Sequence, residues 1–128
     1  MTKLAPYADL LKLRVEERGP GEAPLFIMPF HDDVVGRPGM LHGGAIAGLL
    51  EFAAFGALER AIGADTMVMK PITVTVDYMR SGTSRETYAS AVVERLGNRI
   101  ANVEAHAWQT DRSTPIASAR MNFLLERP

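Results

Sequence analysis

The 128-residue sequence contains no cysteine, almost no net charge and no apolar run long enough to span a bilayer. Without cysteine, disulfides, thiol catalysis and cysteine-ligated zinc are all excluded. The formal net charge is −1 and no basic cluster stands out, so nothing favours nucleic acid as a partner. Internal repeats and low-complexity stretches are missing as well.

Signals for export or membrane insertion are also missing. Residues 1–6 lack the apolar core of a signal peptide. The longest apolar run, residues 43–58, is too short to cross a bilayer and carries Glu51 at its middle. We therefore expect a cytoplasmic protein without membrane contact. Its hydrophobic fraction of 47% and its length predict a single domain, residues 1–128, with a substantial core.

The spacing of apolar residues predicts one long helix over residues 45–62, with Gly63 as its C-cap. Half of this helix lacks a polar stripe, so we expect it to be buried nearly all round. A short helix or turn is expected over residues 6–13, and a buried strand over residues 25–28. After the long helix the period changes to two, which predicts strands over residues 72–80, 86–96, 100–110 and 116–125.

Short turns between these later strands indicate an antiparallel sheet. A helix without a polar face needs cover on several sides, and only one sheet is available to provide it. The sequence therefore predicts an α+β domain in which a curved antiparallel sheet wraps around one long central helix.

The start of that helix carries the most informative motif. Residues 39–44 read Gly-Met-Leu-His-Gly-Gly and lead into the apolar run in which Glu51 is the only charge. A Gly-Gly pair at a helix start leaves backbone N–H groups unpaired where the helix dipole is positive, which suits an oxyanion. A carboxylate in an apolar segment is costly unless it is paired or protonated. The structural alternative is an ion pair with one of three cations: Arg60, Lys70 or Arg80.

Gly43 and Glu51 cannot act on the same atom within one chain. They lie eight residues apart, which is ~12 Å along a helix at 1.5 Å per residue. An oxyanion donor has to lie within about 3 Å of the reacting oxygen. Cooperation therefore requires two antiparallel copies of the helix, as in a two-fold symmetric dimer.

Residues 39–44, followed by an acid nine positions after His42, resemble the hotdog-fold acyl-CoA thioesterases of the phenylacetate-pathway and 4-hydroxybenzoyl-CoA type. The resemblance extends to residues 74–80, 96–99 and 117–123, and so covers nearly the whole chain. It implies a hotdog fold and a hydrolase that takes a coenzyme A thioester as substrate, with no separate cofactor. It also implies a homodimer, and a dimer of dimers as the homotetramer.

The resemblance also implies a role for each matching residue. Glu51 would be the catalytic carboxylate, acting as general base on water or as nucleophile. The backbone N–H of Gly43 or Gly44 would polarise the thioester carbonyl, and His42 would position the thioester and the loop. Further substrate contacts are expected from Arg80, Gly97, Asn98 and Arg99, which fall where such enzymes hold coenzyme A, and from Thr73 and Phe55.

Two positions depart from the family pattern. Related enzymes often carry Asn or Gln where this chain has Gly36, and some carry Ser or Thr where it has Phe55. Phe55 lies one helical turn beyond Glu51 and would narrow or dry the pocket. These departures motivate the alternative of a non-catalytic hotdog dimer that binds acyl-CoA. A hotdog hydratase or dehydratase ranks last, because its His and acid are spaced differently.

Two remaining questions concern metals and the acyl group. His31, Asp32 and Asp33 form a group that could hold a metal, but such residues commonly gather in solvated loops, so we expect no metal site. His106 is one member of an alternating strand, and a structural reading suffices for it. Aryl-acetyl, benzoyl-like and medium-chain acyl groups all stay open as substrates.

Overall fold

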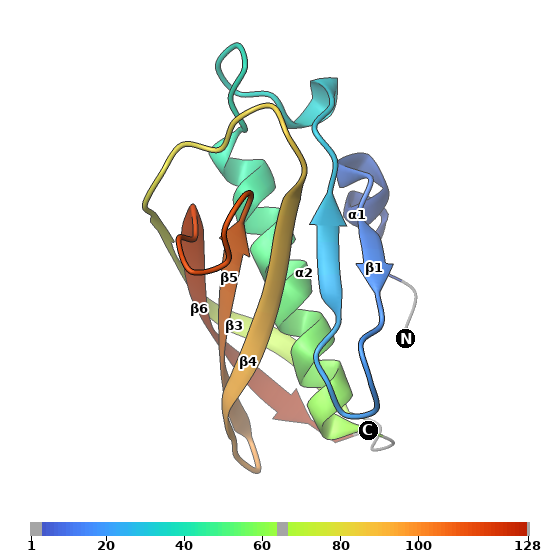
Figure 1. Ribbon diagram of the computed structural model, residues 1–128. Coiled ribbons are helices and arrows are strands. Elements are labelled where there is room, and N and C mark those ends of the chain that lie inside the picture. Colours follow the sequence, from blue (N-terminus) through green and yellow to red (C-terminus); the bar gives the residue numbers. More distant parts are fainter. Residues whose placement is uncertain (1–3, 64–66, 128) are drawn as a thin grey trace.

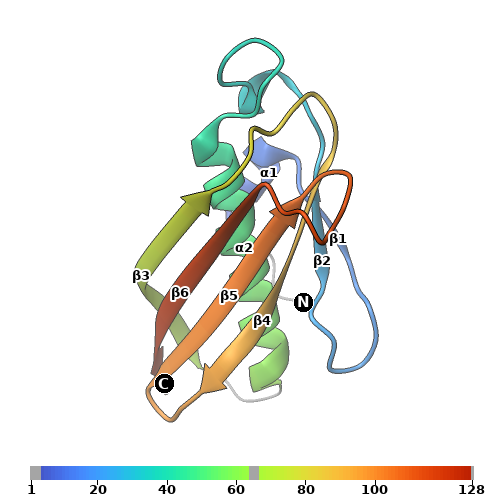
Figure 2. The ribbon, with the colours of Figure 1, turned by 60° about the vertical axis from the view of Figure 1, so that its left-hand side comes forward.

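A long central helix and a curved six-stranded sheet make up most of the computed structural model, which describes residues 4–63 and 67–127. The sheet curves around the helix, as Figures 1 and 2 show from two sides. The predicted α+β architecture is confirmed. Residues 1–3, 64–66 and 128, which the single-domain prediction also covers, lie outside the described residues.

The central helix, α2, runs over Gly43–Ile62 and has caps at both ends. At its start the Nδ1 atom of His42 accepts a hydrogen bond from the N–H of Gly44. At its end Gly63 takes a φ of 71°, and its N–H donates to the carbonyl of Glu59. The predicted helix and C-cap are therefore confirmed. The helix begins two residues earlier than predicted because His42 is its N-cap, so that Gly43 and Gly44 belong to the first turn.

The sheet contains β1 (Arg14–Glu16), β2 (Leu25–Met28), β3 (Val68–Tyr78), β4 (Thr87–Leu96), β5 (Ile100–Trp108) and β6 (Ala117–Glu126). Its order is β1-β2-β4-β5-β6-β3, and every neighbouring pair is antiparallel. The strand over residues 25–28 is confirmed, and β4, β5 and β6 match their predicted ranges to within two residues at either end. The short strand β1 was not predicted.

Small residues let the sheet approach α2 closely. In β4, β5 and β6 buried residues alternate with more exposed ones over much of each strand, and the buried positions are rich in alanine: Ala89, Ala91, Ala101, Ala105, Ala107, Ala117 and Ala119. On the helix, a Cβ at Gly56 would come within 2.7 Å of the ring of Phe26 on β2. Helix and sheet therefore pack at a distance that larger side chains would not allow.

The strand β3 lies at the edge of the sheet, where β6 is its neighbour on one side. It starts four residues earlier than the predicted strand over 72–80 and ends two residues earlier. Pro71 lies in the extension and reads as a strand breaker, but an edge strand tolerates proline because it has no second ladder to donate to. The register shifts between Pro71 and Thr73. Most of β3 is exposed, including the apolar Ile72, Val74 and Tyr78.

The short helix α1 (Pro6–Leu11), expected over residues 6–13, packs across the first half of α2. Lys12 ends it with a left-handed φ of 57°. A one-turn 3-10 helix, η1 (Asp32–Val34), follows β2. Within the described ranges, no helix combines the length and the apolar character that a bilayer span needs.

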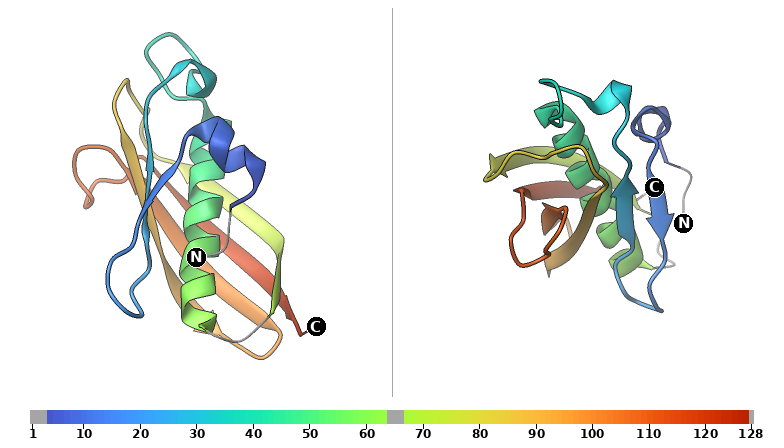
Figure 3. Two further views of the ribbon diagram at one scale, coloured as in Figure 1. Left: turned by 90° about the vertical axis from the view of Figure 1, so that its right-hand side faces the viewer. Right: turned by 45° about the horizontal axis from the view of Figure 1, so that its top comes forward.

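One stripe of α2 is covered by neither the sheet nor α1. Ala47, Glu51, Phe52 and Phe55 are only half-buried there. Figure 3 shows α2 from this side, with the sheet behind it and α1 crossing its upper half. The expectation that α2 is buried nearly all round is wrong for this stripe, because the sheet is open between its two edges.

Candidate active site

The loop before α2 folds tightly against the helix start. The N–H of Gly36 donates to the carbonyl of Met40 at 2.9 Å, and the N–H of His42 donates to the carbonyl of Val34 at 2.8 Å. A Cβ at Gly36 would lie 3.0 Å from the Cα of His42, which is a backbone atom and cannot swing aside. The position where related enzymes carry Asn or Gln is therefore occupied in this chain by a close contact between two backbone segments.

The first turn of α2 holds nearly all of its polar groups in hydrogen bonds. The N–H of Gly44 donates to Nδ1 of His42 at 2.9 Å, so the ring proton of His42 lies on Nε2. The carbonyl of Gly43 accepts a hydrogen bond of 2.8 Å from the hydroxyl of Tyr78, at the end of β3. The N–H of Gly43 has no acceptor among the described residues. Of the two candidate oxyanion donors, the one at Gly43 is the free one.

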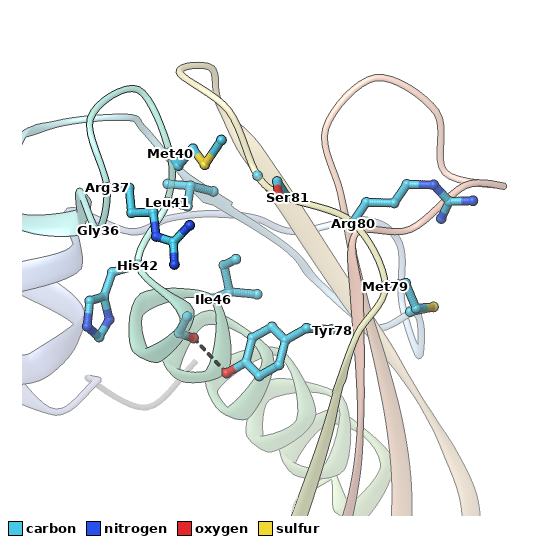
Figure 4. A pocket seen from close by; sticks show the side chains of 12 residues that line it. Gly36, Arg37, Met40, Leu41, His42, Ile46, Tyr78, Met79, Arg80 and Ser81 are labelled. Atoms are coloured by element: carbon cyan, nitrogen blue, oxygen red, sulfur yellow. Dashed lines mark hydrogen bonds between the residues drawn. The ribbon is translucent and has the colours of Figure 1, made fainter.

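A cavity of about 680 Å³ opens at this helix start. Figure 4 shows it from close by, with the Tyr78–Gly43 hydrogen bond as a dashed line. His42, Gly43 and Tyr78 border it, together with Arg37 and Arg80. The helix dipole is positive at this end, and the guanidinium of Arg37 points toward it (Figure 4). This charge and the first turn of α2 make the cavity suitable for a negatively charged or polarised group.

Glu51 lies in a second cavity of about 430 Å³. Apart from its carboxylate, the side chains around it are apolar or aromatic: Tyr7, Phe52, Phe55, Pro71, Met121 and Phe123. Phe55 does lie beside Glu51, as its helical spacing predicts. The cavity is therefore an apolar site with one acidic group in its wall.

The carboxylate of Glu51 makes no hydrogen bond or ion pair with any described residue. The three cations considered as its partners bond elsewhere. Arg60, Lys70 and Arg80 take Glu17, Glu126 and the carbonyl of Pro115 respectively. An ion pair within the chain does not account for Glu51.

The two cavities share no lining residue. Gly43 borders the first and Glu51 the second, as the eight-residue spacing along α2 requires. Within one chain, the structure therefore keeps the free N–H and the free carboxylate apart. This separation is what the helix rise predicts.

The predicted substrate contacts are scattered over the chain. Figure 4 shows Arg80 extending away from the helix start, where it donates to the carbonyl of Pro115 at 2.7 Å. Thr73 is exposed on β3 and borders neither cavity. Residues 97–99 form the hairpin between β4 and β5, at the opposite end of the molecule from the start of α2 (Figures 1 and 2). The roles of Gly97, Asn98 and Arg99 stay predictions.

The histidines outside the motif have structural partners. Nε2 of His31 donates to the carbonyl of Leu11 at 3.1 Å and so ties the end of α1 to the loop. His106 faces Glu104 at 3.3 Å on β5. In the parts of the chain that the structure describes, no three acidic or histidine side chains are grouped to hold a metal.

Sequence reasoning missed the two tyrosines at the site. In the sequence, Tyr78 falls within the alternating strand expected over residues 72–80, and Tyr7 within the short helix or turn expected over residues 6–13. Their partners are 35 and 37 residues away in the sequence, so no local pattern points to these contacts.

Comparison with known proteins identifies the family of this chain. The family model for the thioesterase superfamily matches residues 38–116. A solved protein of Chromobacterium violaceum is 33% identical, over 93% of this chain and 82% of that chain, with a TM-score of 0.75. Among curated proteins no match was found.

Two more distant structures share the fold. A thioesterase of Haemophilus influenzae superposes with a TM-score of 0.84 at 17% identity, over 94% of this chain and 82% of that one. A Bacillus halodurans protein, solved with CoA, gives a TM-score of 0.81 at 21% identity, over 98% and 81% of the two chains. The predicted hotdog fold is confirmed. Because the family model spans more than half of its length, this chain belongs to the thioesterase superfamily.

Proposed function

We propose that this protein is an acyl-CoA thioesterase whose active site forms between the two protomers of a homodimer. Membership of the superfamily supports thioester hydrolysis, and the CoA in the Bacillus halodurans relative supports an acyl-CoA substrate. One observation carries the proposal. Among the described residues, Glu51 has no partner in an apolar cavity, and the N–H of Gly43 has no acceptor at a positive helix end.

The open side of the chain favours an antiparallel pair. The edge strand β3 exposes Ile72 and Val74, and beside it lies the half-buried stripe of α2 that carries Glu51. An exposed apolar edge strand is a template for pairing with another chain. Two-fold pairing along β3 sets the two α2 helices side by side and antiparallel, which brings the partner's Glu51 toward Gly43. A dimer of dimers is the proposed further assembly.

The proposed reaction uses each group once. The thioester carbonyl binds at the start of α2, where the N–H of Gly43 stabilises the oxyanion of the tetrahedral intermediate. In the general-base route, the partner's Glu51 takes a proton from water as the water oxygen attacks the carbonyl carbon. The carbon–sulfur bond then breaks, and the departing thiolate takes the proton, giving a carboxylic acid and CoA. In the nucleophilic route, the carboxylate of Glu51 attacks the carbonyl carbon, the carbon–sulfur bond breaks and the CoA thiolate leaves a mixed anhydride. Water then hydrolyses the anhydride to the carboxylic acid and free Glu51, and the thiolate takes up the proton that this step releases.

The other predicted residues fit supporting roles in this scheme. His42 fixes the helix start through Gly44 and presents Nε2–H on an exposed ring. In an antiparallel pair, the hairpin that carries Gly97, Asn98 and Arg99 lies toward the partner's helix start, where it can hold the arm of CoA. The guanidinium of Arg80 suits a phosphate. Thr73 on the shared strand is a substrate contact in the same scheme.

A non-catalytic acyl-CoA-binding dimer is the alternative, and two contacts favour it. Gly36 leaves no polar side chain beside His42, and Phe55 occupies the turn after Glu51 where a hydroxyl would otherwise assist. Such a protein would hold the thioester without turning it over.

Thiol release from an acyl-CoA panel separates these functions. The panel spans aryl-acetyl, benzoyl and straight-chain acyl groups, with free thiol followed colorimetrically. The thioesterase proposal predicts release from at least one member. Stabilisation of the protein by acyl-CoA without any release would support the binding module instead. Hydration of an enoyl-CoA without thiol release would favour a hydratase.

A further inference from the structure

The helix α1 is seated directly on the backbone of α2 at Gly48. A Cβ at Gly48 would lie 2.7 Å from Cε2 of Tyr7 and 3.2 Å from Cδ1 of Leu11. Leu11 is buried and anchors the end of α1 in the core. Glycine at position 48 is therefore what allows the ring of Tyr7 to rest on the surface of α2.

The ring of Tyr7 borders the cavity of Glu51 on one side and solvent on the other. It lines the cavity together with Phe52, and the two ring centroids are 6.3 Å apart. At the same time Tyr7 is 44% exposed. Its hydroxyl lies 3.5 Å from the carbonyl of Gly44, which holds the ring across the first turns of α2. The ring of Tyr7 thus forms the part of the cavity wall that lies over the first turns of α2.

The position of Tyr7 defines one end of that cavity. Gly48, on which the ring rests, precedes Glu51 by three residues, which is roughly 4.5 Å along the helix. Phe55 bounds the cavity one turn beyond Glu51 on the other side. An acyl chain whose carbonyl carbon reacts with Glu51 therefore has a limited length before it meets an aromatic wall.

We propose that Tyr7 is a specificity-determining residue that closes the acyl cavity and limits the length of the acyl chain, and that the accepted acyl groups are uncharged and apolar. This inference rests on the proposed thioesterase function. A second carboxylate, as in a dicarboxylic acyl group, would be desolvated among apolar side chains beside Glu51 and is excluded.

Chain-length profiles of Tyr7 variants test the proposal. kcat/KM is measured with straight-chain acyl-CoA substrates of increasing length for the wild type, Tyr7→Ala, Tyr7→Trp and the matched control Tyr7→Phe. Tyr7→Ala should favour chains about two carbons longer, raising the long-to-short ratio about fifteenfold, since each buried methylene is worth roughly fourfold (about 0.8 kcal/mol). Tyr7→Trp should favour shorter chains, and Tyr7→Phe should keep the wild-type profile.

A binding measurement separates failure of this inference from failure of the proposed function. Kd values for S-alkyl-CoA thioethers, which cannot be hydrolysed, are measured on the same variants and should show the same shift in preferred length. If no acyl-CoA is hydrolysed but the shift in Kd is present, the proposed function fails and the role of Tyr7 stands. Unchanged profiles in both Tyr7→Ala and Tyr7→Trp, with cooperative melting of both variants, overturn the role of Tyr7. Absence of thioether binding by the wild type overturns it as well.

Discussion

The start of α2 and its middle are eight residues apart and are built in opposite ways. At the start, His42 and Tyr78 take up the polar groups of the first turn and leave a single donor, the N–H of Gly43. In the middle, apolar side chains surround a single acidic group, Glu51. The first region is a hydrogen-bonded frame around a free donor, and the second is an apolar cavity around a free carboxylate.

The free donor and the free carboxylate indicate a role in function rather than a contribution to the stability of the fold. A carboxylate in an apolar cavity lowers the stability of the fold unless it is paired, and the three cations considered as its partners bond elsewhere. The two leftover groups are complementary, since one can donate to an oxyanion and the other can accept a proton. In the proposed mechanism, each acts on the thioester only when the other is brought to it from a second chain.

Glu51→Gln is expected to have the largest effect, because it removes the base from the apolar cavity while keeping its volume. We expect kcat to fall by roughly 10²–10⁴-fold. Thiol release with the best substrate of the panel measures it. Glu94→Gln, on the exposed part of β4, is the matched control and should keep wild-type activity. Equal activity of wild type and Glu51→Gln would exclude this carboxylate from the mechanism.

Gly43→Pro tests the start of α2, because it removes only the free N–H of Gly43. Gly43 is the first residue of the helix, where proline is well accepted, and His42 before it has φ −70° and ψ 134°, which suits a residue that precedes proline. We expect kcat to fall by about 10²–10³-fold, as for loss of one oxyanion donor.

Gly43→Ala is the matched control for that variant, because it keeps the N–H. Its Cβ would lie 3.5 Å from the ring of Tyr78, an ordinary contact, so activity should stay within a few-fold of wild type. If the alanine and proline variants lose activity equally, the N–H of Gly43 is not the oxyanion donor.

Tyr78→Phe tests whether the frame at the helix start depends on its hydrogen bond to Gly43. Loss of that bond should lower the free energy of unfolding by about 1 kcal/mol. A decrease of a few-fold in kcat should accompany it, with KM little changed. Chemical denaturation and steady-state kinetics measure the two effects. A fully active variant of wild-type stability would show that the hydroxyl does not position the first turn.

Gly36→Ala tests the loop that packs against the start of α2. The added Cβ meets the backbone of His42 at 3.0 Å, so we expect a loss of roughly 1–3 kcal/mol in the free energy of unfolding. Gly36→Asn should lose stability in the same way instead of gaining activity as a restored polar helper. A faster Gly36→Asn enzyme of unchanged stability would contradict this reading of the loop.

The sequence predicted the elements that depend on the spacing of neighbouring residues. It missed the features that depend on contacts between segments far apart in the chain. The helix and the strands after Thr87 follow from apolar periodicity, and the separation of Gly43 from Glu51 follows from the helix rise alone. The early start of β3 was missed because Pro71 reads as a breaker until the strand is known to lie at an edge. Tyr7 and Tyr78 meet α2 through chain reversals that no local pattern encodes.

The central claim is that Gly43 and Glu51 act together across two protomers, and complementation between two inactive variants tests it most directly. Glu51→Gln and Gly43→Pro are prepared separately, then mixed and re-paired, with differently tagged mixed dimers confirmed by tandem purification. Activity should return to about a quarter of the wild-type value, because half of the dimers are mixed and one of their two sites holds both intact groups. Confirmed mixed dimers that stay inactive would contradict a site shared between the two chains.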